Sequence, residues 1–511
     1  MAKGKKKKMR AMMERSDLIS SLPDVLLAFI ISFLSGEEAV RTSVLSNRWK
    51  TLWKYSYHLS FDQRQILKHL IKIDNQNSKP RSRLARDVHP KILGIHPEDN
   101  AKLDTVAEAS MLIMSIMDKH IGPLKSCNIR HLGMSCVNGD VVRWMKKLLE
   151  KGVVKVSMGL ESYEYFITLN YILLGQAKRT LDLPFEIFTS FEVLELNHYC
   201  FITTPSLDLN QVLKTLTLNQ VCVSSNNFQE IISHCSSLEN LTLNNCDFSG
   251  DEVNIDSSSL KYFKILDMNV QKMLVSAANM EVIEIESIIC IDKDLAFETP
   301  KLHILRVHND VKRIGQYLRT RDIIEICGGI VGRRGSNMGS IFNNLVTLCL
   351  DLDFTNIRNS ISLSFAVKSC HRLKNLQINN QVNMDCNGGT SDRGTSDQNE
   401  NDCLPYPGVL FWQLREPCWC VTYQLKSLCI RGYTGGEFEV EFVKYLILNG
   451  GVLEKISIWF LEDCSWVNVV ATNCLLSYPK LSPGLSFDLK PGVEYMRKYG
   501  GSFEKWVTTL K

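Results

Sequence analysis

From about residue 190 onward, apolar residues recur in hexamers whose first, fourth and sixth positions are apolar. The copies are FEVLEL (191–196), LKTLTL (213–218), LENLTL (238–243), LKYFKI (260–265), MEVIEI (280–285), LHILRV (302–307), LVTLCL (345–350), LKNLQI (373–378), LKSLCI (425–430) and LEKISI (453–458). Because successive side chains of a strand point to opposite faces, each copy predicts a short strand with one buried face. No copy can bury that face alone, so we expect the strands to stack into one parallel sheet.

The spacing of the copies predicts a leucine-rich-repeat solenoid. Between the copies at 213 and 302 the intervals are 25, 22, 20 and 22 residues, which is the period of such repeats. The 43 residues from 302 to 345 suggest one skipped, degenerate copy. Segments between copies, such as 224–237, have helical spacing and are expected on the convex side. The predicted fold is therefore α/β, with the parallel sheet on the concave side.

Two fragments upstream of these copies, IRHLGM (129–134) and VVKVSM (153–158), are candidate opening repeats.

Polar residues alternate with the buried leucines and are predicted to line the concave face, where a target protein would bind. The candidate target-binding residues are Asn219, Asn240, Thr242, Asn244, Tyr262, Glu284, Glu286, Arg306 and His308. Lys264, Asp351 and Gln377 belong to the same alternation. The charges are mixed, which suits a complementary protein surface better than a polyanion. For any single residue, ordinary solvation of a strand face is the alternative.

A second apolar pattern occupies residues 22–53, ahead of the repeats. Apolar residues recur at helical spacing from Leu22 to Leu34, and Pro23 suits a first helical turn. Ser35 and the following glycine end this helix, and Ser46 is a candidate cap for a later one. A segment of about forty residues cannot form a self-sufficient core without a disulfide, a metal or a partner. The surplus apolar surface indicates either packing on the rest of the chain or docking to another protein.

The order LPDVLLAFIISFL (22–34) followed by AVRTSVLSNRWKTLW (39–53) resembles the F-box of plant proteins. The resemblance implies an all-α domain of three short helices that docks on the adaptor subunit of an SCF (cullin-RING) ubiquitin ligase. By position in the motif, the implied adaptor-binding residues are Leu22, Pro23, Leu26, Ile30, Phe33, Leu34, Val44, Leu45, Arg48, Trp49 and Trp53. Tryptophan and arginine often dominate interface energetics, which fits a docking role.

The C-terminal part carries a second resemblance. Phe411-Trp412, Pro417, IRGYTGGEFEVEFVKYLILNG (430–450) and LEKISI resemble the FBD region of plant F-box/leucine-rich-repeat proteins. Its pattern predicts strand, helix and strand, which would add repeats and cap the open end of the solenoid. This resemblance implies no biochemical role for the region.

These patterns predict a division of the chain into seven parts. They are a disordered basic tip (1–15), the F-box (16–62), a helical connection (63–125), leucine-rich repeats (126–380), a flexible polar insertion (381–404), the FBD region (405–470) and a C-terminal extension (471–511).

Composition and charge narrow the function classes. The chain has 511 residues and a net charge of +4, and much of this positive charge lies in MAKGKKKKMR (1–10). The rest of the chain is therefore nearly neutral, which argues against a nucleic-acid binder. The 17 cysteines lack paired C-x-x-C spacing, which is typical of free thiols in the cytosol or nucleus. No run of eighteen apolar residues predicts a membrane span. The lysines at 3–8 are either a nuclear-import signal or a simple basic tip, and the expected location is nucleus, cytoplasm or both.

The sequence predicts a protein without catalytic residues, metal or cofactor. It contains no phosphate-binding glycine loop, HExxH or G-x-S-x-G motif, and GGIVGRRG (328–335) is expected to be a loop between repeats. The expected function is the substrate-recognition subunit of an SCF ligase, with the adaptor, through it a cullin, and an unknown target protein as partners. The alternatives are a repeat scaffold that binds the adaptor without target turnover, or a nuclear nucleic-acid or chromatin binder.

Overall fold

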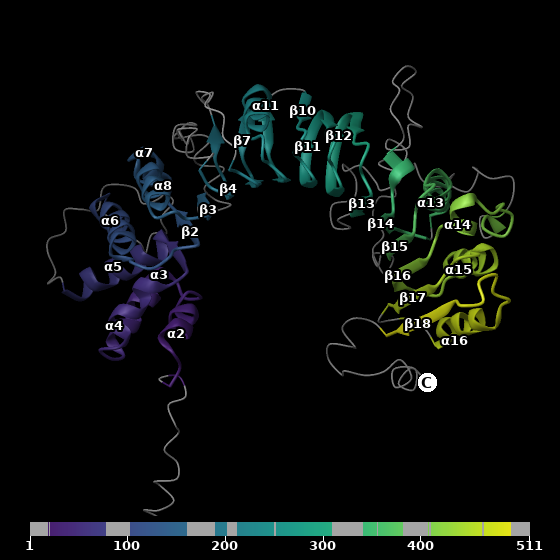
Figure 1. The fold of residues 1–511 in the computed structure, drawn as a ribbon, viewed down its shortest axis with the longest axis horizontal. Coiled ribbons are helices and arrows are strands. Elements are labelled where there is room, and N and C mark those ends of the chain that lie inside the picture. The colour runs from purple at the N-terminus through teal and green to yellow at the C-terminus, as the bar shows by residue number, and fades with distance from the viewer. Residues whose placement is uncertain are drawn as a thin grey trace, which may run out of the picture. The chain divides into compact units, whose positions relative to one another are not determined.

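The structure is a computed structural model divided into two compact units, Met1–Asp208 and Leu209–Lys511. It describes residues 19, 21–77, 103–160, 190–201, 212–249, 252–308, 341–354, 356–381, 407, 410–461, 464 and 466–491 (Figure 1). The predicted basic tip, the GGIVGRRG loop and nearly all of the predicted polar insertion lie outside the described residues.

The first unit combines short helices with a small parallel sheet. Its helical segments are α2 (Asp24–Ile31), α3 (Gly36–Arg41), η1 (Thr42–Val44), α4 (Trp49–Leu52), η2 (Trp53–Tyr55), α5 (Gln63–Asn77), α6 (Leu103–Lys119), α7 (Gly133–Val137) and α8 (Asp140–Glu150). Its strands are β1 (His58–Asp62), β2 (Ser126–His131), β3 (Lys155–Leu160), β4 (Val193–Asn197) and β5 (Cys200–Phe201). β1 to β4 are parallel neighbours in chain order. The sheet therefore begins at β1, earlier than the predicted start of the repeats at residue 126.

The N-terminal helices pack directly on the first strand. The Ser32 hydroxyl accepts a hydrogen bond from the Tyr57 N–H (2.8 Å) and donates one to the Ala28 carbonyl (2.8 Å), which ties the end of α2 to the start of β1. A Cβ atom at Gly36 would lie 2.5 Å from the Phe61 ring, so this close approach of α3 to β1 requires glycine. The helices are thereby fixed to the sheet.

Ser35, and not Ser46, caps a helix in this segment. The Ser35 hydroxyl accepts from the Glu38 N–H (3.3 Å) while the Glu38 carboxylate accepts from the Ser35 N–H (3.1 Å), which forms a capping box at the start of α3. α4 begins at Trp49 without a side-chain cap, so the prediction that Ser46 caps a helix is wrong. Pro23 lies at the N-cap of α2, one position before the predicted first turn.

We expect Ser35→Ala to lower the free energy of unfolding of the first unit by about 1 kcal/mol, because it leaves the Glu38 N–H of α3 without its acceptor. Ser46→Ala is the matched control and should change it by less than about 0.5 kcal/mol, since Ser46 is exposed. Urea denaturation, with hydrogen exchange of the α3 amides, measures both. Equal losses in the two variants would show that the capping box does not stabilise α3.

The second unit is built on a parallel sheet with strands in chain order, β6-β8-β11-β12-β13-β14-β15-β16-β17-β18, and with β10 beside β11 (Figure 1). The strands are β6 (Thr215–Asn219), β7 (Cys222–Ser224), β8 (Asn240–Asn244), β9 (Asp247–Ser249), β10 (Glu252–Asp256), β11 (Tyr262–Ser276), β12 (Val282–Glu298), β13 (Ile304–His308), β14 (Thr347–Leu352), β15 (Asn375–Asn380), β16 (Ser427–Tyr433), β17 (Lys455–Phe460) and β18 (Ser486–Lys490). Every predicted hexamer forms a strand, β4 of the first unit included, and the alternating residues such as Leu241 and Phe263 are fully buried. The predicted α/β repeat fold is confirmed.

In most repeats, helices cover the side of this sheet on which the leucines of the hexamers are buried. They are α11 (Ser225–His234), η6 (Ile341–Asn344), α13 (Ile357–Ser369), α14 (Trp419–Tyr423), α15 (Glu437–Asn449), α16 (Trp466–Cys474) and η9 (Leu475–Ser477). The helix predicted within 224–237 is confirmed as α11, capped by Ser224. β11 and β12 instead run on for 15 and 17 residues and pair again beyond a register shift, with Lys272 opposite Asp294. There the prediction of outer helices is wrong, because the outer part of β11 keeps a strand pattern in which Met273 and Val275 are buried and their neighbours are half-buried.

The corners of successive repeats share one backbone conformation. Gln220, Asn245, Asp267 and Ser287 each follow an inner strand segment and have φ of 52°, 48°, 48° and 59°. Gly432 occupies the corresponding corner of a later repeat with φ 69°, where a Cβ would also lie 2.8 Å from the Asn380 carbonyl oxygen. Left-handed residues at these positions turn the chain off the sheet without disturbing the stacked leucines.

No repeat is missing between residues 302 and 345. β13 pairs directly with β14, with Ile304 opposite Thr347, so the predicted skipped copy is wrong and the interval is an insertion between neighbouring strands. Asn375 lies opposite Ser427 in the same way, so the long interval before β16 also leaves the sheet uninterrupted. β18 extends the sheet past β17 within the segment predicted as a C-terminal extension.

Candidate functional site

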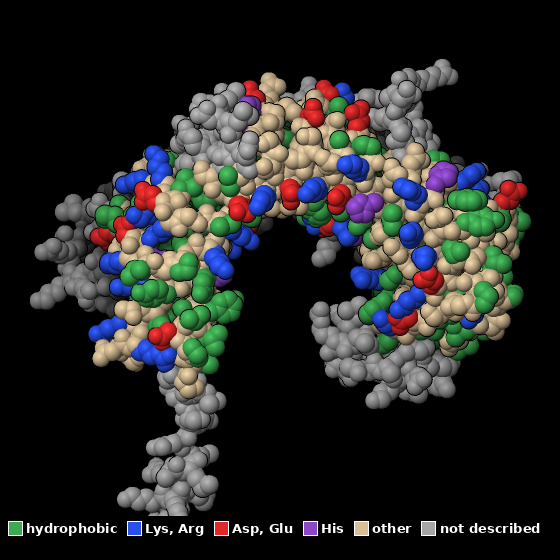
Figure 2. All heavy atoms as spheres, viewed as in Figure 1, with side chains coloured by type: hydrophobic (Ala, Val, Ile, Leu, Met, Phe, Trp, Pro, Cys, Tyr) green, Lys and Arg blue, Asp and Glu red, His purple; other side chains and the backbone are tan. Residues whose placement is uncertain are grey.

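The helices of residues 24–55 carry an apolar surface. Its exposed members, which we call the apolar face, are Val25, Leu26, Phe29, Ile30, Phe33, Val44, Leu45 and Tyr55. Phe33 and Val44 are 73% and 86% exposed, and the Phe29 and Phe33 rings meet edge to face at 5.0 Å. Figure 2 shows apolar side chains gathered over this part of the first unit. Apolar surface exposed in this way on a folded protein indicates an interaction site.

Most of the predicted adaptor-binding residues reach this surface. Pro23, Leu26, Ile30, Phe33, Val44, Leu45 and Arg48 are exposed, and Leu22 and Leu34 are half-buried. Trp49 and Trp53 are only 8% and 4% exposed, so they lie in the core beneath the face and support it, which corrects the expectation that they offer their side chains to a partner. Val25 and Phe29 are exposed and were not among the predicted contacts. The apolar character of α2 on all sides was the signal that could have found them.

Arg48 holds the two ends of this segment together. Its guanidinium donates to the Asp24 carboxylate (Nε to Oδ1, 2.7 Å) and to the Leu22 carbonyl (2.6 Å). The ion pair of Arg48 with Asp24 is exposed, so its net contribution to stability is small, on the order of 0–1 kcal/mol. Its effect is to fix the start of α2 beside the later helices and so to shape the apolar face.

The second candidate surface is the polar face of the sheet in the second unit. The pairing of neighbouring strands places all nine predicted target-binding residues on the side opposite the buried leucines, each half-buried. The row through β8, β11, β12 and β13 contains Thr242, Lys264, Glu284 and Arg306, each opposite the next. Residues twenty or more positions apart in sequence thus form continuous rows of side chains.

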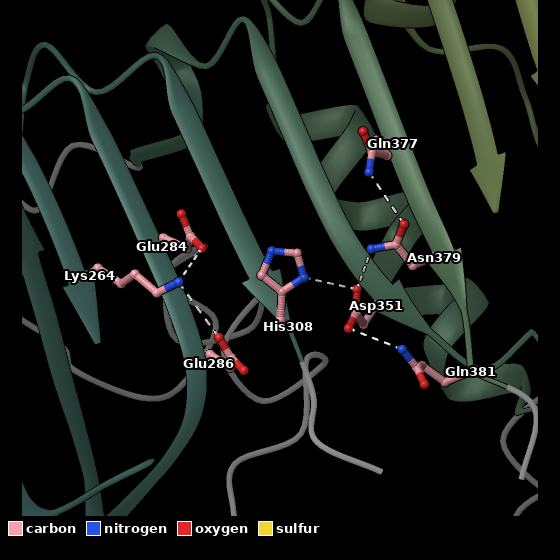
Figure 3. Close-up of polar contacts among 8 residues, drawn as sticks. All are labelled: Lys264, Glu284, Glu286, His308, Asp351, Gln377, Asn379 and Gln381. Carbon is pink, nitrogen blue, oxygen red and sulfur yellow. Dashed lines mark hydrogen bonds and ion pairs between the residues drawn. The ribbon is translucent and has the colours of Figure 1, made fainter. Parts of the chain in front are cut away.

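Glu284 is the centre of one network on this face, and Figure 3 shows its contact with Lys264. Its carboxylate accepts hydrogen bonds from Lys264 Nζ (2.8 Å) and from the Tyr262 hydroxyl (2.9 Å), and Arg306 lies 3.7 Å away. Lys264 also lies 3.7 Å from Glu286. Burial would raise the pKa of Glu284, but the bonds from Lys264 and Tyr262 prevail and lower it. The carboxylate is therefore ionised and held in place before any partner arrives.

Asp351 is the centre of a second network. His308 is the one member of this network among the nine candidate target-binding residues. Its carboxylate is 6% exposed and accepts hydrogen bonds from Asn379 Nδ2 (2.6 Å) and Gln381 Nε2 (3.2 Å), while His308 Nδ1 lies 3.2 Å from Oδ1 (Figure 3). Gln377 donates to Asn379 at 3.3 Å and extends the network. Such satisfied polar networks give a rigid, patterned surface suited to selective protein contacts.

We expect the stability that His308 contributes to be present at low pH and lost as the pH rises. The bond to Asp351 raises the pKa of His308 against the opposing effect of burial, and Glu284 and Glu286 add to the rise. A group whose pKa is raised by folding stabilises the fold below its unfolded value of about 6.5, and this stabilisation is lost as pH passes the folded pKa. Between about pH 6 and pH 9, the unfolding free energy of the wild type should fall by about 1 kcal/mol relative to His308→Gln.

Urea denaturation at both pH values measures this difference. His371→Gln, which removes an exposed histidine from the same unit, controls for the loss of a histidine elsewhere. A difference that stayed constant or increased with pH would contradict a stabilising His308–Asp351 bond.

Two cysteine thiols lie on the polar face of the sheet. Burial raises the pKa of Cys349 and Cys429, both on the polar face, so these thiols are protonated and weakly nucleophilic at neutral pH. Within the described ranges no group of His, Cys, Asp and Glu has the arrangement of a metal site, and the cysteines there are free. No helix in the part that the structure covers is both long and apolar enough to cross a membrane.

Comparison with known proteins defines the class. The F-box domain model matches residues 19–60, the model for the leucine-rich repeats of the FBD-associated F-box protein At5g56370 matches 142–313, and the FBD model matches 413–458. The predicted resemblance is confirmed: the chain contains an F-box domain, leucine-rich repeats and an FBD domain, which are domains of proteins that mediate protein interaction. F-box domains generally bind the adaptor subunit of SCF complexes, and the family names are those of non-catalytic, adaptor-type proteins.

Relatives in Arabidopsis thaliana are named as F-box proteins, one of them as an F-box/LRR-repeat protein. The F-box protein At1g80960 is 24% identical over 466 residues, which span 86% of this chain and 83% of that protein. The putative F-box/LRR-repeat protein At3g42770 is also 24% identical, over 94% of this chain and 81% of its own length. The putative F-box protein At1g67390 is 29% identical over 53% of this chain and 49% of its own length.

Proposed function

We propose that the protein is the substrate-recognition subunit of an SCF ubiquitin ligase. The observation that carries the proposal is the apolar face, a group of exposed large side chains on a segment that matches the F-box. A protein that exposes Phe33 and Val44 to water to this extent gains free energy when a partner covers them. The adaptor is the partner that an F-box binds, and a cullin follows through the adaptor.

The polar face of the sheet supplies the second half of the proposal, the binding of a target protein. Its side chains are held by the Glu284 and Asp351 networks, so little conformational entropy is lost when a complementary surface docks. The protein contributes no acid, base or nucleophile in this mechanism. It raises the effective concentration of target lysines near the conjugating enzyme, and the other subunits transfer ubiquitin. A nuclear or cytoplasmic location belongs to the same proposal.

The test is a trapping experiment in cells with the Leu26→Asp, Val44→Asp double variant. Both residues are exposed, so the variant is expected to fold, to lose the adaptor, and to retain and accumulate the target proteins bound by the sheet. The wild-type chain should bind the same proteins at lower abundance and in ubiquitinated form. Retention of the adaptor would refute the docking assignment. Equal abundance of bound proteins in both cases would favour the alternative of a scaffold without target turnover.

A further inference from the structure

The polar face of the sheet is nearly neutral over β11 to β14 and basic toward its C-terminal end. The hexamers of β11 to β14, each taken with the residue that follows it, contain three Lys or Arg and four carboxylates. Those of β15 to β17, together with β18, contain five Lys or Arg and only two carboxylates. Figure 2 shows Lys and Arg side chains gathered over these last strands. The charged members of this part, which we call the basic end, are Lys374, Lys426, Arg431, Lys455 and Lys490, with Glu454 and Asp488.

The two carboxylates of the basic end neutralise only part of its charge. Glu454 Oε1 lies 2.6 Å from Lys426 Nζ. Asp488 Oδ2 lies 3.0 Å from Lys455 Nζ and 3.1 Å from Lys490 Nζ, so one carboxylate serves two ammonium groups. Over β11 to β14, by contrast, the carboxylates at least match the cations in number. A partner of negative charge therefore gains more at the basic end than elsewhere on this face.

Arg431 is the cation best placed to receive a carboxylate. It ends the inner segment of β16, it is exposed, and it makes no ion pair with any residue that the structure describes. Lys374, on the neighbouring β15, is likewise exposed and without an ion pair in the described part of the chain. A guanidinium presents its N–H donors in a planar fork that matches the two oxygens of a carboxylate. An Asp or Glu side chain of a partner can therefore pair here without displacing a carboxylate of this chain.

An aromatic side chain lies beside Arg431. Trp459 of β17 is opposite Arg431 in the strand pair and is half-buried, and Lys490 Nζ lies 4.6 Å from the centre of its ring, which helps to hold the ring in place. Tryptophan and arginine are enriched among the residues that dominate the energetics of interfaces. Toward the start of both strands, the next side chains on this face are the short ones of Ser457 and its partner Cys429. A peptide that lies across the strands meets no bulky side chain there.

We propose that the basic end binds an acidic segment of the target protein in which a large apolar side chain lies next to an Asp or Glu. The carboxylate pairs with Arg431, and the apolar side chain packs on Trp459. A protein segment fits better than a nucleic acid, because Glu454 and Asp488 lie among the cations and repel a continuous row of phosphates. The proposal rests on the proposed function, since it names the chemistry of the target for the same polar face. It also gives a role to the FBD region, because β16 and most of β17 lie in the segment that the FBD model matches.

The test is a selection from a library of random peptides of about 12 residues displayed on phage, with the full chain as bait; four neighbouring strands span about 14 Å, so this length exceeds the site. We expect the selected peptides to be enriched in Asp and Glu, with an aromatic or aliphatic residue next to them. The Lys374→Glu, Arg431→Glu double variant should lose this enrichment. Lys368→Glu reverses an exposed lysine of α13, outside the polar face, and should keep it. Selection of neutral or basic peptides, or of the same acidic peptides by the double variant, would overturn the proposal.

Titration with the most enriched peptide measures the two expected contacts. Arg431→Glu and Trp459→Ala should each weaken binding by at least about tenfold, and Lys368→Glu should bind as the wild type does. Arg431 is exposed, so its variant is expected to fold even if Trp459→Ala does not. Wild-type affinity in Arg431→Glu would contradict the proposal. Displacement of the peptide by single-stranded oligothymidylate would overturn it in favour of a nucleic-acid ligand.

Neither experiment contains the adaptor, so their results do not depend on docking through the apolar face. If the selection yields no acidic peptides while the Leu26→Asp, Val44→Asp variant still loses the adaptor, the proposal about the basic end fails and the ligase role stands. Acidic peptides that bind through Arg431 in a chain that does not bind the adaptor would support the basic end and refute the ligase role.

Discussion

Replacing Phe33 with aspartate is expected to weaken adaptor binding by at least about thirtyfold and to leave the first unit folded. Phe33 is among the most exposed apolar residues of the apolar face, and its ring contacts only Phe29 among the described aromatic side chains. The substitution removes an anchor and places a carboxylate where binding would strip it of water. Loss of an interface anchor costs about 2 kcal/mol or more, which corresponds to about thirtyfold in affinity.

Two variants separate docking from folding in this experiment. Met111→Asp introduces the same charge at an exposed apolar residue of α6, in the same unit but outside the F-box, and should leave adaptor affinity unchanged. Leu27→Ala alters a fully buried neighbour in α2 and should destabilise the unit by about 2–5 kcal/mol. Calorimetric titration with the adaptor and thermal melting measure the two effects separately. Wild-type affinity in Phe33→Asp would mean that the adaptor binds elsewhere.

The strands of the repeats could be predicted because a period-2 pattern determines both the element and its buried face. Interval length was a weaker guide, since 43 residues between two hexamers fit a degenerate repeat and an insertion equally well. Only the pairing of Ile304 with Thr347 decides between them. The outer halves of β11 and β12 were missed for a related reason. The expected repeat geometry favoured helices, whereas in β11 the buried Met273 and Val275 alternate with half-buried neighbours, which is a strand pattern.

The order of residues in the F-box could be recognised, but their exposure could not. α2 is apolar on all sides, so a stripe from Leu22 to Leu34 does not reveal which side meets the sheet. The structure buries Leu27 and Ile31 and exposes Leu26 and Ile30. The burial of Trp49 and Trp53 could not be predicted either, because large aromatic residues serve equally well as interface anchors and as core residues.

The networks on the polar face were partly within reach of the sequence. Lys264 and Glu284 are separated by one repeat, so their spacing alone places them on neighbouring strands. His308 and Asp351 are 43 positions apart and could be paired only once β13 and β14 were known to be neighbours. The error about the skipped copy therefore hid the contact of His308 with Asp351, although Asp351, the most buried carboxylate in these networks, belongs to the predicted polar alternation.

Replacing Glu439 with alanine is expected to lower the free energy of unfolding of the second unit by about 3 kcal/mol. Glu439 is 1% exposed in the first turn of α15, and its carboxylate accepts hydrogen bonds from the Thr434 N–H (2.9 Å), the Thr434 hydroxyl (2.7 Å), the Gly436 N–H (3.1 Å) and Asn380 Nδ2 (2.5 Å). It thus joins α15 both to the turn before it and to β15. Its removal leaves these donors without their acceptor around a buried position, and breaking a buried charged network costs about 3–5 kcal/mol.

Glu437→Ala is the matched control, because Glu437 lies in the same helical turn but is exposed, and its loss should cost less than about 0.5 kcal/mol. Glu439→Gln keeps the volume and one acceptor oxygen, so an intermediate loss of about 1–2 kcal/mol is expected. Urea denaturation gives the free energies, and hydrogen exchange at the Thr434 and Gly436 amides shows whether those bonds are the ones lost. Equal stability of the Glu437 and Glu439 alanine variants would mean that α15 is held only by its buried apolar side chains, such as Phe442 and Leu446.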